Sequence, residues 1–198
     1  MQSTGSLVLA TATGSGFGGA IALGLWRDKT VLEHLVEVAR VGGADVIVIV
    51  VGPRAQEVIS LVDLDDVVIV INDDYQEGSA SSLRAGLDTM WRSDEIETAI
   101  IMEVERPGVA PETVISLAEA SRSAMKPITV PKYRNTRGSP IAVDRSLWPR
   151  LMSFEENLDL LDLIAAHPDW AEEIRFEHSS PVKVETPTDL LTAAESPR

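Results

Sequence analysis

Residues 6–25, near the N-terminus, read SLVLATATGSGFGGAIALGL, and this stretch decides the fold. It opens with an apolar run at 7–10 and continues with five glycines between Gly14 and Gly24. An apolar run without polar alternation is typical of a strand that helices cover on both faces. Glycines let backbone N–H groups approach a ligand closely. We therefore expect a ligand loop after the first strand of an open α/β sheet, with a plain glycine-rich turn as the alternative.

The same loop spells G-x-G-x-x-G through Gly14, Gly16 and Gly19, which is the spacing of a dinucleotide-binding Rossmann unit. Its context disfavours an NAD(P)-dependent oxidoreductase. The second expected strand, 45–51, ends in Gly-Pro and offers no acidic side chain at its tip for a ribose hydroxyl. The chain also lacks a Tyr and a Lys at the spacing found in short-chain dehydrogenases.

Helix and strand patterns alternate along the chain with short connections, which indicates a doubly wound sheet. The expected strands of the first half are 7–10, 45–51, 67–71 and 98–102. The expected helices are 30–40 with Thr30 as its cap, 54–62, one that begins near Ser79, and one from Pro111 to about Met125.

The second half of the chain has a different pattern. We expect two strands around an Arg-Asn-Thr-Arg-Gly turn at 134–138, a mostly helical stretch at 148–169, and weaker strands at 173–178 and 182–184. A last helix follows Thr186, with Asp189 completing a variant of the capping box. The sequence thus predicts a single α/β domain, 1–198, with a Rossmann-like three-layer α/β/α architecture and a mostly parallel sheet.

Charge and composition exclude several classes of partner. The chain has 31 acidic and 17 basic residues, a formal net charge of −14, and no cysteine. A field of that sign repels nucleic acid and anionic membranes, so a phosphorylated ligand needs a metal ion, backbone N–H groups or a local basic cluster. No apolar run approaches the length of about 18 residues that a membrane span requires. We therefore expect no nucleic-acid or membrane partner and a cytoplasmic location.

Several motifs, in order and at consistent spacing, resemble the MobA-like nucleotidyltransferases, and most closely the branch that includes molybdenum-cofactor cytidylyltransferases. The matching pieces are LATATGSGFGG, TVLEHLVEVA, the N-x-x-x-x-EGSASSLRAGL segment that opens at Asn72, Arg106-Pro107, RGSP and ETPTDL. The resemblance implies a fold of the nucleotide-diphospho-sugar transferase type. It also implies Mg²⁺-dependent transfer of a nucleoside monophosphate from an NTP, expected to be CMP from CTP, to a phosphorylated acceptor such as molybdopterin. A molybdoenzyme or its maturation factor is the partner that it implies.

The resemblance also assigns site residues. Those that would bind phosphates are Thr11, Ala12, Gly14, Ser15, Gly16, Gly18 and Gly19. Ser81 and Ser82, with Leu83 behind them, would face the nucleobase, although helix capping is the alternative for the serines. The acceptor would meet Arg137, Gly138 and Ser139. Glu105 and Glu185 would hold Mg²⁺ and carry the catalysis.

The chain departs from the family where charge matters in the reaction. Gly16 stands in place of an Arg, and Ile21 in place of a phosphate-binding Lys. Loss of one preorganised donor typically costs about 3–4 kcal/mol of transition-state stabilisation. Lys183 stands where the family has an acid, and Glu105 and Glu185 replace aspartates. The longer side chains move the carboxylates by about 1.5 Å, whereas Mg²⁺ holds its ligands near 2.1 Å.

Three functions remain open. The first is a working nucleotidyltransferase that uses Glu105 and Glu185 for the metal and loop N–H groups for the triphosphate. The second is a non-catalytic relative that binds a nucleotide or cofactor as a partner protein, which the missing Arg and Lys favour. The third, less favoured, is the Rossmann oxidoreductase.

Two local features bear on these functions. Glu103 offers a third carboxylate, and it would share a face with Glu105 if the strand geometry continued that far. Lys132, Arg134 and Arg137 form the one dense basic group of the sequence. That group is either an anionic acceptor site or a solvated hairpin tip.

Overall fold

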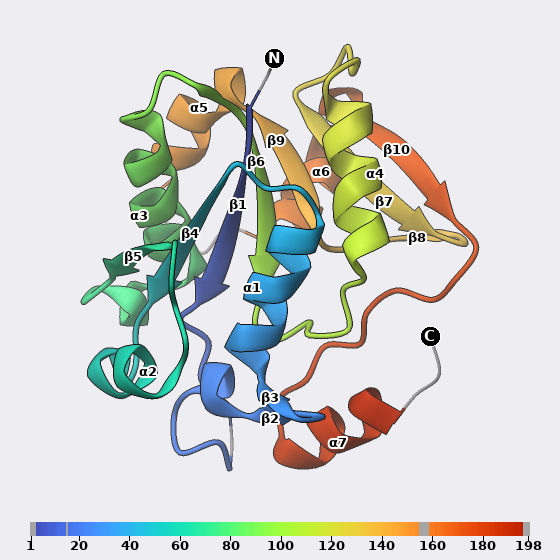
Figure 1. Ribbon diagram of the computed structural model, residues 1–198. Coiled ribbons are helices and arrows are strands. Elements are labelled where there is room, and N and C mark those ends of the chain that lie inside the picture. The colour runs from blue at the N-terminus through green and yellow to red at the C-terminus, as the bar shows by residue number, and fades with distance from the viewer. Residues whose placement is uncertain (1–2, 15, 155–158, 196–198) are drawn as a thin grey trace.

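One mixed sheet organises the computed structural model, which describes residues 3–14, 16–154 and 159–195 (Figure 1). Within these ranges the sheet has eight strands. They are β1 (Ser3–Ala10), β4 (Val46–Val51), β5 (Val68–Ile71), β6 (Ile96–Glu103), β7 (Ile128–Tyr133), β8 (Thr136–Arg137), β9 (Ile141–Asp144) and β10 (Ala171–Phe176). Their order is β10-β7-β9-β6-β1-β4-β5, with β8 paired to β7.

Most neighbouring strands of this sheet run in parallel. β1 pairs in parallel with β4 and β6, β4 with β5, and β10 with β7. β9 is antiparallel to both β6 and β7, and β8 is antiparallel to β7. The mostly parallel sheet predicted from the sequence is confirmed.

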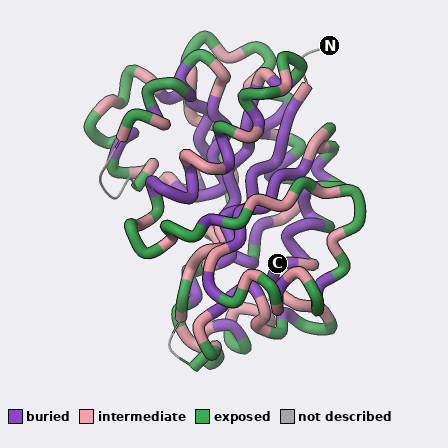
Figure 2. Tube along the Cα trace, turned by 90° about the vertical axis from the view of Figure 1, so that its left-hand side faces the viewer, coloured by how far each residue is buried: buried purple, intermediate pink, exposed green. Residues whose placement is uncertain are grey.

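Helices cover both faces of the sheet. Side chains alternate between the faces along each strand, so apolar strands present an apolar surface on each side. On β1, Val8 and Ala10 pack into one core, and Leu7 and Leu9 pack into the other. The first core includes residues of α1 (Val31–Val41), α2 (Ala55–Leu61), α4 (Pro111–Ser121) and α7 (Pro187–Glu195). The second includes residues of α3 (Ser79–Trp91), α5 (Trp148–Met152) and α6 (Leu160–Ala166). Buried backbone fills the centre in Figure 2, and the three-layer α/β/α prediction is confirmed.

Two helix starts follow their sequence signals. The Thr30 hydroxyl accepts a hydrogen bond from Glu33 N, and the Glu33 carboxylate accepts one from Thr30 N. At α7, Asp189 N donates to the Thr186 hydroxyl, and Thr186 N donates to the Asp189 carboxylate. Both are reciprocal capping boxes that satisfy otherwise unpaired N–H groups.

Several element boundaries differ from the sequence prediction. A small hairpin, β2 (Leu25–Trp26) with β3 (Lys29–Thr30), was not predicted. The helix expected to reach Met125 ends at Ser121, and Met125 is 96% exposed, so no packing extends the helix. Residues 182–184 form no strand, because Val184 N pairs with a carbonyl beyond the end of β6.

The remaining pieces are short 3₁₀ turns, and just one of them, at 168–170, overlaps the stretch at 148–169 that was expected to be mostly helical, where the described residues form α5 and α6. They are η1 (Ile21–Leu23), η2 (Tyr75–Glu77), η3 (Arg145–Leu147) and η4 (Pro168–Trp170). Among the helices of the described ranges, none is both long enough and apolar enough to cross a bilayer.

Candidate functional site

A cleft of about 510 Å³ lies at the carboxyl ends of β1 and β6. From β1 the chain builds outward to β4 and β5 and then returns to place β6 on the other side of β1. Such a reversal of strand order leaves a crevice in which open α/β sheets bind ligands. The lining residues are Leu9, Thr11, Ala12, Thr13, Tyr75, Gln76, Gly78, Ser79, Ser82, Glu103 and Glu105. The volume falls in the range of small-molecule sites, roughly 300–1,000 Å³.

Hydroxyl groups form one wall of the cleft. Thr11 Oγ1 lies 2.8 Å from Ser82 Oγ, which joins the end of β1 to the first turn of α3. The Asn72 amide, at the end of β5, donates to Ser81 Oγ at 3.0 Å and to Ser82 Oγ at 3.1 Å. Sequence reasoning assigned no role to Asn72, although the residue directly follows a predicted strand and opens a matching motif.

The predicted base-facing residues separate in the structure. Ser82 lines the cleft. Ser81 Oγ instead lies 2.8 Å from the Gly78 carbonyl and 3.0 Å from the Asp74 carbonyl, so it closes the start of the helix. Leu83 is 3% exposed in the core behind them. Ser82 therefore takes the cleft position, whereas Ser81 donates to backbone carbonyls before the helix, and the residue at the N-cap of α3, Gly78, provides no side-chain cap.

The glycine-rich loop packs against the segment that leads into α7. Three of its glycines have positive φ, namely Gly16, Gly18 and Gly19. A Cβ on Gly14 would lie 2.8 Å from the Glu185 carbonyl, and one on Gly16 would lie 3.1 Å from Pro187 Cδ. Ser15, a predicted phosphate-binding residue, lies outside the described residues. Thr11 and Ala12 line the cleft, and the glycines continue from them toward Glu185.

Two carboxylates face the cleft from the end of β6. The strand ends at Glu103, and a turn follows in which Arg106 N donates to the Glu103 carbonyl at 3.0 Å. The strand geometry therefore does not continue to Glu105, but both side chains still line the cleft. Burial raises the pKa of Glu105, and the negative charge of Glu103 raises it further. Burial and the repulsion from Glu103 disfavour the ionised Glu105 carboxylate, so binding of a positive charge beside it is favourable.

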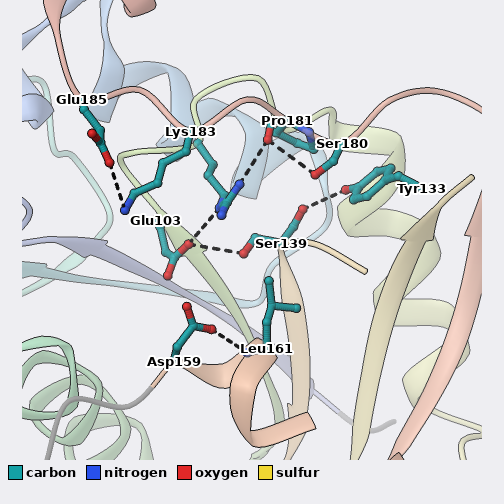
Figure 3. Close-up of polar contacts among 10 residues, drawn as sticks. Glu103, Tyr133, Ser139, Asp159, Leu161, Ser180, Pro181, Lys183 and Glu185 are labelled. Atoms are coloured by element: carbon teal, nitrogen blue, oxygen red, sulfur yellow. Dashed lines mark hydrogen bonds and ion pairs between the residues drawn. The ribbon is translucent and has the colours of Figure 1, made fainter. Parts of the chain in front are cut away.

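Glu185 reaches the same region from the C-terminal part of the chain. Val184 N donates to the Glu105 carbonyl at 2.7 Å, which places the backbones of the two predicted metal ligands side by side. The Glu185 carboxylate lies 3.5 Å from Lys183 Nζ, and Figure 3 shows this pair above Glu103. The Glu105 and Glu185 metal pair stays a prediction, and Glu103, the third carboxylate expected from the sequence, lines the same cleft as Glu105.

The predicted acceptor residues do not form one group. Ser139 Oγ donates to the Glu103 carboxylate at 3.3 Å, at the edge of the cleft (Figure 3). Arg137 Nε instead donates to Glu173 at 2.8 Å, in a separate shallow pocket. Gly138 lies between them, and a Cβ there would lie 2.7 Å from the Ser180 hydroxyl. The turn therefore contributes Ser139 to the edge of the cleft and Arg137 to the separate pocket.

The basic side chains around this turn are tied to neighbouring groups, and one carboxylate offsets part of their charge. Lys132 Nζ donates to the second oxygen of Glu173 at 2.8 Å, so one carboxylate holds both Lys132 and Arg137. These hydrogen bonds hold the pKa of Glu173 below its usual range. Arg134 Nε donates to the Glu177 carbonyl at 3.1 Å. Such tied side chains offer an anion less charge than the sequence indicates.

The carboxylates of the described residues show how a divalent metal ion would fit the cleft. Among the described residues, no group of three or more His, Cys, Asp or Glu side chains is arranged to hold a metal ion alone. Mg²⁺ is commonly bound by one or two carboxylates together with substrate phosphates. Glu103 and Glu105, which repel each other in the cleft, fit that mode of binding. Oxygen donors are also the ligand type that Mg²⁺ prefers.

Fold and site together define an α/β protein with a ligand-sized cleft at the carboxyl ends of its central strands, and sequence comparison gives its family. The model of the MobA-like NTP transferase domain matches residues 6–171, and the chain belongs to this family. The chain is 32% identical over 154 residues to nicotine blue oxidoreductase of Paenarthrobacter nicotinovorans, covering 74% of each protein.

Solved structures of the same fold are close neighbours. Rv0371c of Mycobacterium tuberculosis superposes with a TM-score of 0.88 at 25% identity, over 98% of both chains. A manganese complex of Rv0371c superposes with a TM-score of 0.85 at 24% identity, over 100% of both chains. The Rossmann-like fold of the nucleotide-diphospho-sugar transferase type, expected from the sequence, is confirmed.

Proposed function

We propose that this protein binds a nucleoside triphosphate in the cleft and transfers its nucleoside monophosphate, CMP in the expected case, to a phosphorylated acceptor such as molybdopterin. One observation carries the proposal. The carboxylate pair of Glu103 and Glu105 shares a single cleft with the Thr11 and Ser82 hydroxyls, next to the glycine-rich loop. The family of the chain supports the same reaction class.

The side chains divide the work of binding. Loop N–H groups after Thr11 would bind the phosphates, and positive φ at Gly16, Gly18 and Gly19 turns the backbone there. Ser82 offers a hydroxyl to the nucleoside. Glu103 and Glu105 would hold Mg²⁺, with Glu185 adjacent. A divalent metal supplies charge neutralisation for the phosphates when bound.

The reaction itself needs little covalent chemistry from the protein. An oxygen of the acceptor phosphate attacks the α-phosphorus, the bond from that phosphorus to the bridging oxygen breaks, and pyrophosphate leaves with the electron pair. The protein contributes by holding the two substrates in line and by excluding competing geometries. Ser139 and Arg106 stand at the edge of the cleft, beside Glu103, where an acceptor would enter.

Calorimetric titration with CTP, GTP and ATP, with and without Mg²⁺ or Mn²⁺, tests the proposal. We expect metal-dependent binding of one triphosphate and pyrophosphate release when molybdopterin is added. Glu105→Gln should abolish the metal dependence and Glu103→Gln should weaken it, because each removes a negative ligand. Glu119→Gln, on the exposed face of α4, is the matched control and should behave as the wild type.

Failure has two distinct forms. Binding of a triphosphate without any turnover would contradict catalysis and favour the hypothesis that the protein is a non-catalytic, nucleotide-binding relative. Absence of all triphosphate binding would contradict the proposal.

A second candidate is a nicotinamide-dependent oxidoreductase, because the relative that is 32% identical is nicotine blue oxidoreductase. Among the described residues that line the cleft, none is Lys, Arg or His, so the charge pattern suits a dinucleotide no worse than a triphosphate. Titration with NADH and NADPH, followed by an assay of nicotine blue reduction, separates the two. Tight dinucleotide binding without triphosphate binding would reverse the order of the candidates.

A further inference from the structure

The candidate cleft has a deficit of positive charge. Its described lining includes the carboxylates of Glu103 and Glu105 and no basic side chain. The family positions of an Arg and a Lys hold Gly16 and Ile21, and Ile21 is buried at 1% exposure. A nucleotide phosphate chain brings several further negative charges into this surrounding. Charges of one sign at such distances are costly unless a cation lies close by.

Three basic side chains of the described residues lie around the cleft, and two of them are engaged. Arg54 donates two hydrogen bonds to Glu57 and one, at 3.2 Å, to the Gly18 carbonyl. Arg106 donates to the Pro181 carbonyl at 3.3 Å and pairs with Glu103 at 3.4 Å. These contacts fix both guanidinium groups to the protein.

Lys183 is the third basic side chain, and it keeps its donors available. Its ammonium forms one ion pair, with Glu185 at 3.5 Å, and makes no hydrogen bond among the described residues. The side chain is 52% exposed, so it can reorient without disturbing the core. An ammonium group has three donors and rotates freely, which suits an anion with several equivalent oxygens.

The backbone holds Lys183 at the cleft. Val184 is completely buried, and its N–H donates to the Glu105 carbonyl at 2.7 Å. Lys183 and Glu185 flank Val184, and their ion pair shows that both side chains lie on the same side of the segment (Figure 3). The pKa of Glu105 is raised by burial and by Glu103, and the positive charge of Lys183 offsets part of that rise.

We propose that the Lys183 ammonium binds the phosphate chain of the nucleotide and takes the place of the basic side chains missing from the glycine-rich loop. In the bound state the ammonium exchanges Glu185 for phosphate oxygens. Glu185 is then free to approach a metal ion beside Glu105. This inference rests on the proposed function only in requiring a phosphorylated nucleotide, either a triphosphate or the pyrophosphate of a dinucleotide.

The test compares ligands that differ in phosphate content. Calorimetry in the presence of Mg²⁺ measures binding of cytidine, CMP and CTP, and separately of NADH, to the wild type and to Lys183→Ala. We expect about a tenfold or greater loss of affinity for CTP, a smaller loss for CMP and no change for cytidine, since a hydrogen bond to a charged group is worth about 1.5–3 kcal/mol. Lys183→Arg keeps the charge and should recover part of the loss.

Lys29→Ala is the matched control. Lys29 is also an exposed lysine with one carboxylate partner, Glu37 at 2.6 Å, and its side chain is 40% exposed. It should bind every ligand as the wild type does, which separates the local effect of Lys183 from a change of net charge. Equal thermal unfolding of both variants and the wild type confirms that folding is unaffected.

The outcomes distinguish the two proposals. If the wild type binds CTP and Lys183→Ala binds it equally well, the role of Lys183 is overturned while the proposed function stands. Binding of NADH without CTP, weakened by Lys183→Ala, would support Lys183 and overturn nucleotidyl transfer. An equal loss of cytidine and CTP binding would show a general defect of the cleft and overturn phosphate recognition. Wild-type binding of no phosphorylated ligand would overturn both.

Discussion

Thr11 Oγ1 and Ser82 Oγ lie 2.8 Å apart, and this contact ties the end of the central strand β1 to the first turn of α3 across the wall of the cleft. Both hydroxyl groups also belong to residues that line the cleft. Ser82 is further held by the Asn72 amide at 3.1 Å. A ligand that enters therefore meets a preorganised polar surface, because the hydroxyl positions are fixed before binding.

Ser82→Ala should weaken nucleotide binding, because it removes a fixed hydroxyl from the cleft wall and leaves Thr11 and Asn72 without that partner. A lost hydrogen bond of this kind corresponds to about 1 kcal/mol, or roughly fivefold in affinity. Ser81→Ala is the control, since Ser81 shares the Asn72 amide but faces the Asp74 and Gly78 carbonyls. Calorimetry should show weaker binding for Ser82→Ala only, and an equal effect of both would contradict the assignment.

Gly14→Ala should destabilise the protein and impair the site together. The added Cβ would lie 2.8 Å from the Glu185 carbonyl and 2.6 Å from the Phe17 ring, so the loop and the segment before α7 must move apart. Overpacking of this kind costs about 1–3 kcal/mol. Gly108→Ala is the control, because the nearest atom to its Cβ would be 3.8 Å away. Thermal unfolding measures the change in stability, and nucleotide titration measures the change in affinity. Unchanged nucleotide binding by Gly14→Ala would show that the loop does not contribute to the binding site.

The ion pairs of Glu173 should make stability depend on acid pH. Lys132 and Arg137 hold the folded pKa of Glu173 below the unfolded value of about 4.3. The stabilisation is therefore complete above the unfolded pKa and is lost as the pH falls through the folded one. We expect Glu173→Gln to lower the free energy of unfolding by up to about 1 kcal/mol at neutral pH, since the side chain is 25% exposed.

Urea unfolding at several pH values checks this dependence on Glu173. The difference between the wild type and Glu173→Gln should shrink as the pH falls below the unfolded pKa of about 4.3 and through the lower folded one. Glu172→Gln removes an exposed carboxylate that makes no ion pair among the described residues, and it should produce no such trend. A difference that grows on acidification would refute the sign of the argument.

The capping box at α7 should stabilise the segment that carries Lys183 and Glu185. Thr186→Ala removes the hydroxyl that accepts from Asp189 N, which costs about 1 kcal/mol at a helix start. In a chain of this size that corresponds to roughly 2–4 °C in Tm. Thr192→Ala, within the same helix, loses an exposed bond to the Thr188 carbonyl and should change Tm less. Equal shifts for the two variants would argue against the cap.

Local sequence signals determined much of the fold. The apolar run of β1, the Thr30 cap and the Thr186 capping box each depend on residues a few positions apart. Such signals act within one strand or one helix turn, so a sequence displays them directly. The motifs of the glycine-rich loop and of α3 likewise indicate the family and the three-layer sheet through their residues and spacing alone.

Tertiary structure alone decided how the site is assembled. The bond from Val184 N to Glu105 spans most of the second half of the chain, and no local pattern predicts it. The same holds for Asn72 on the two serines, and for Glu173 between Lys132 and Arg137. Hydrogen bonds and ion pairs depend on the positions of atoms that only the packed sheet brings together. The sequence thus supplied the elements and the chemistry of the side chains, while packing determined which side chains meet.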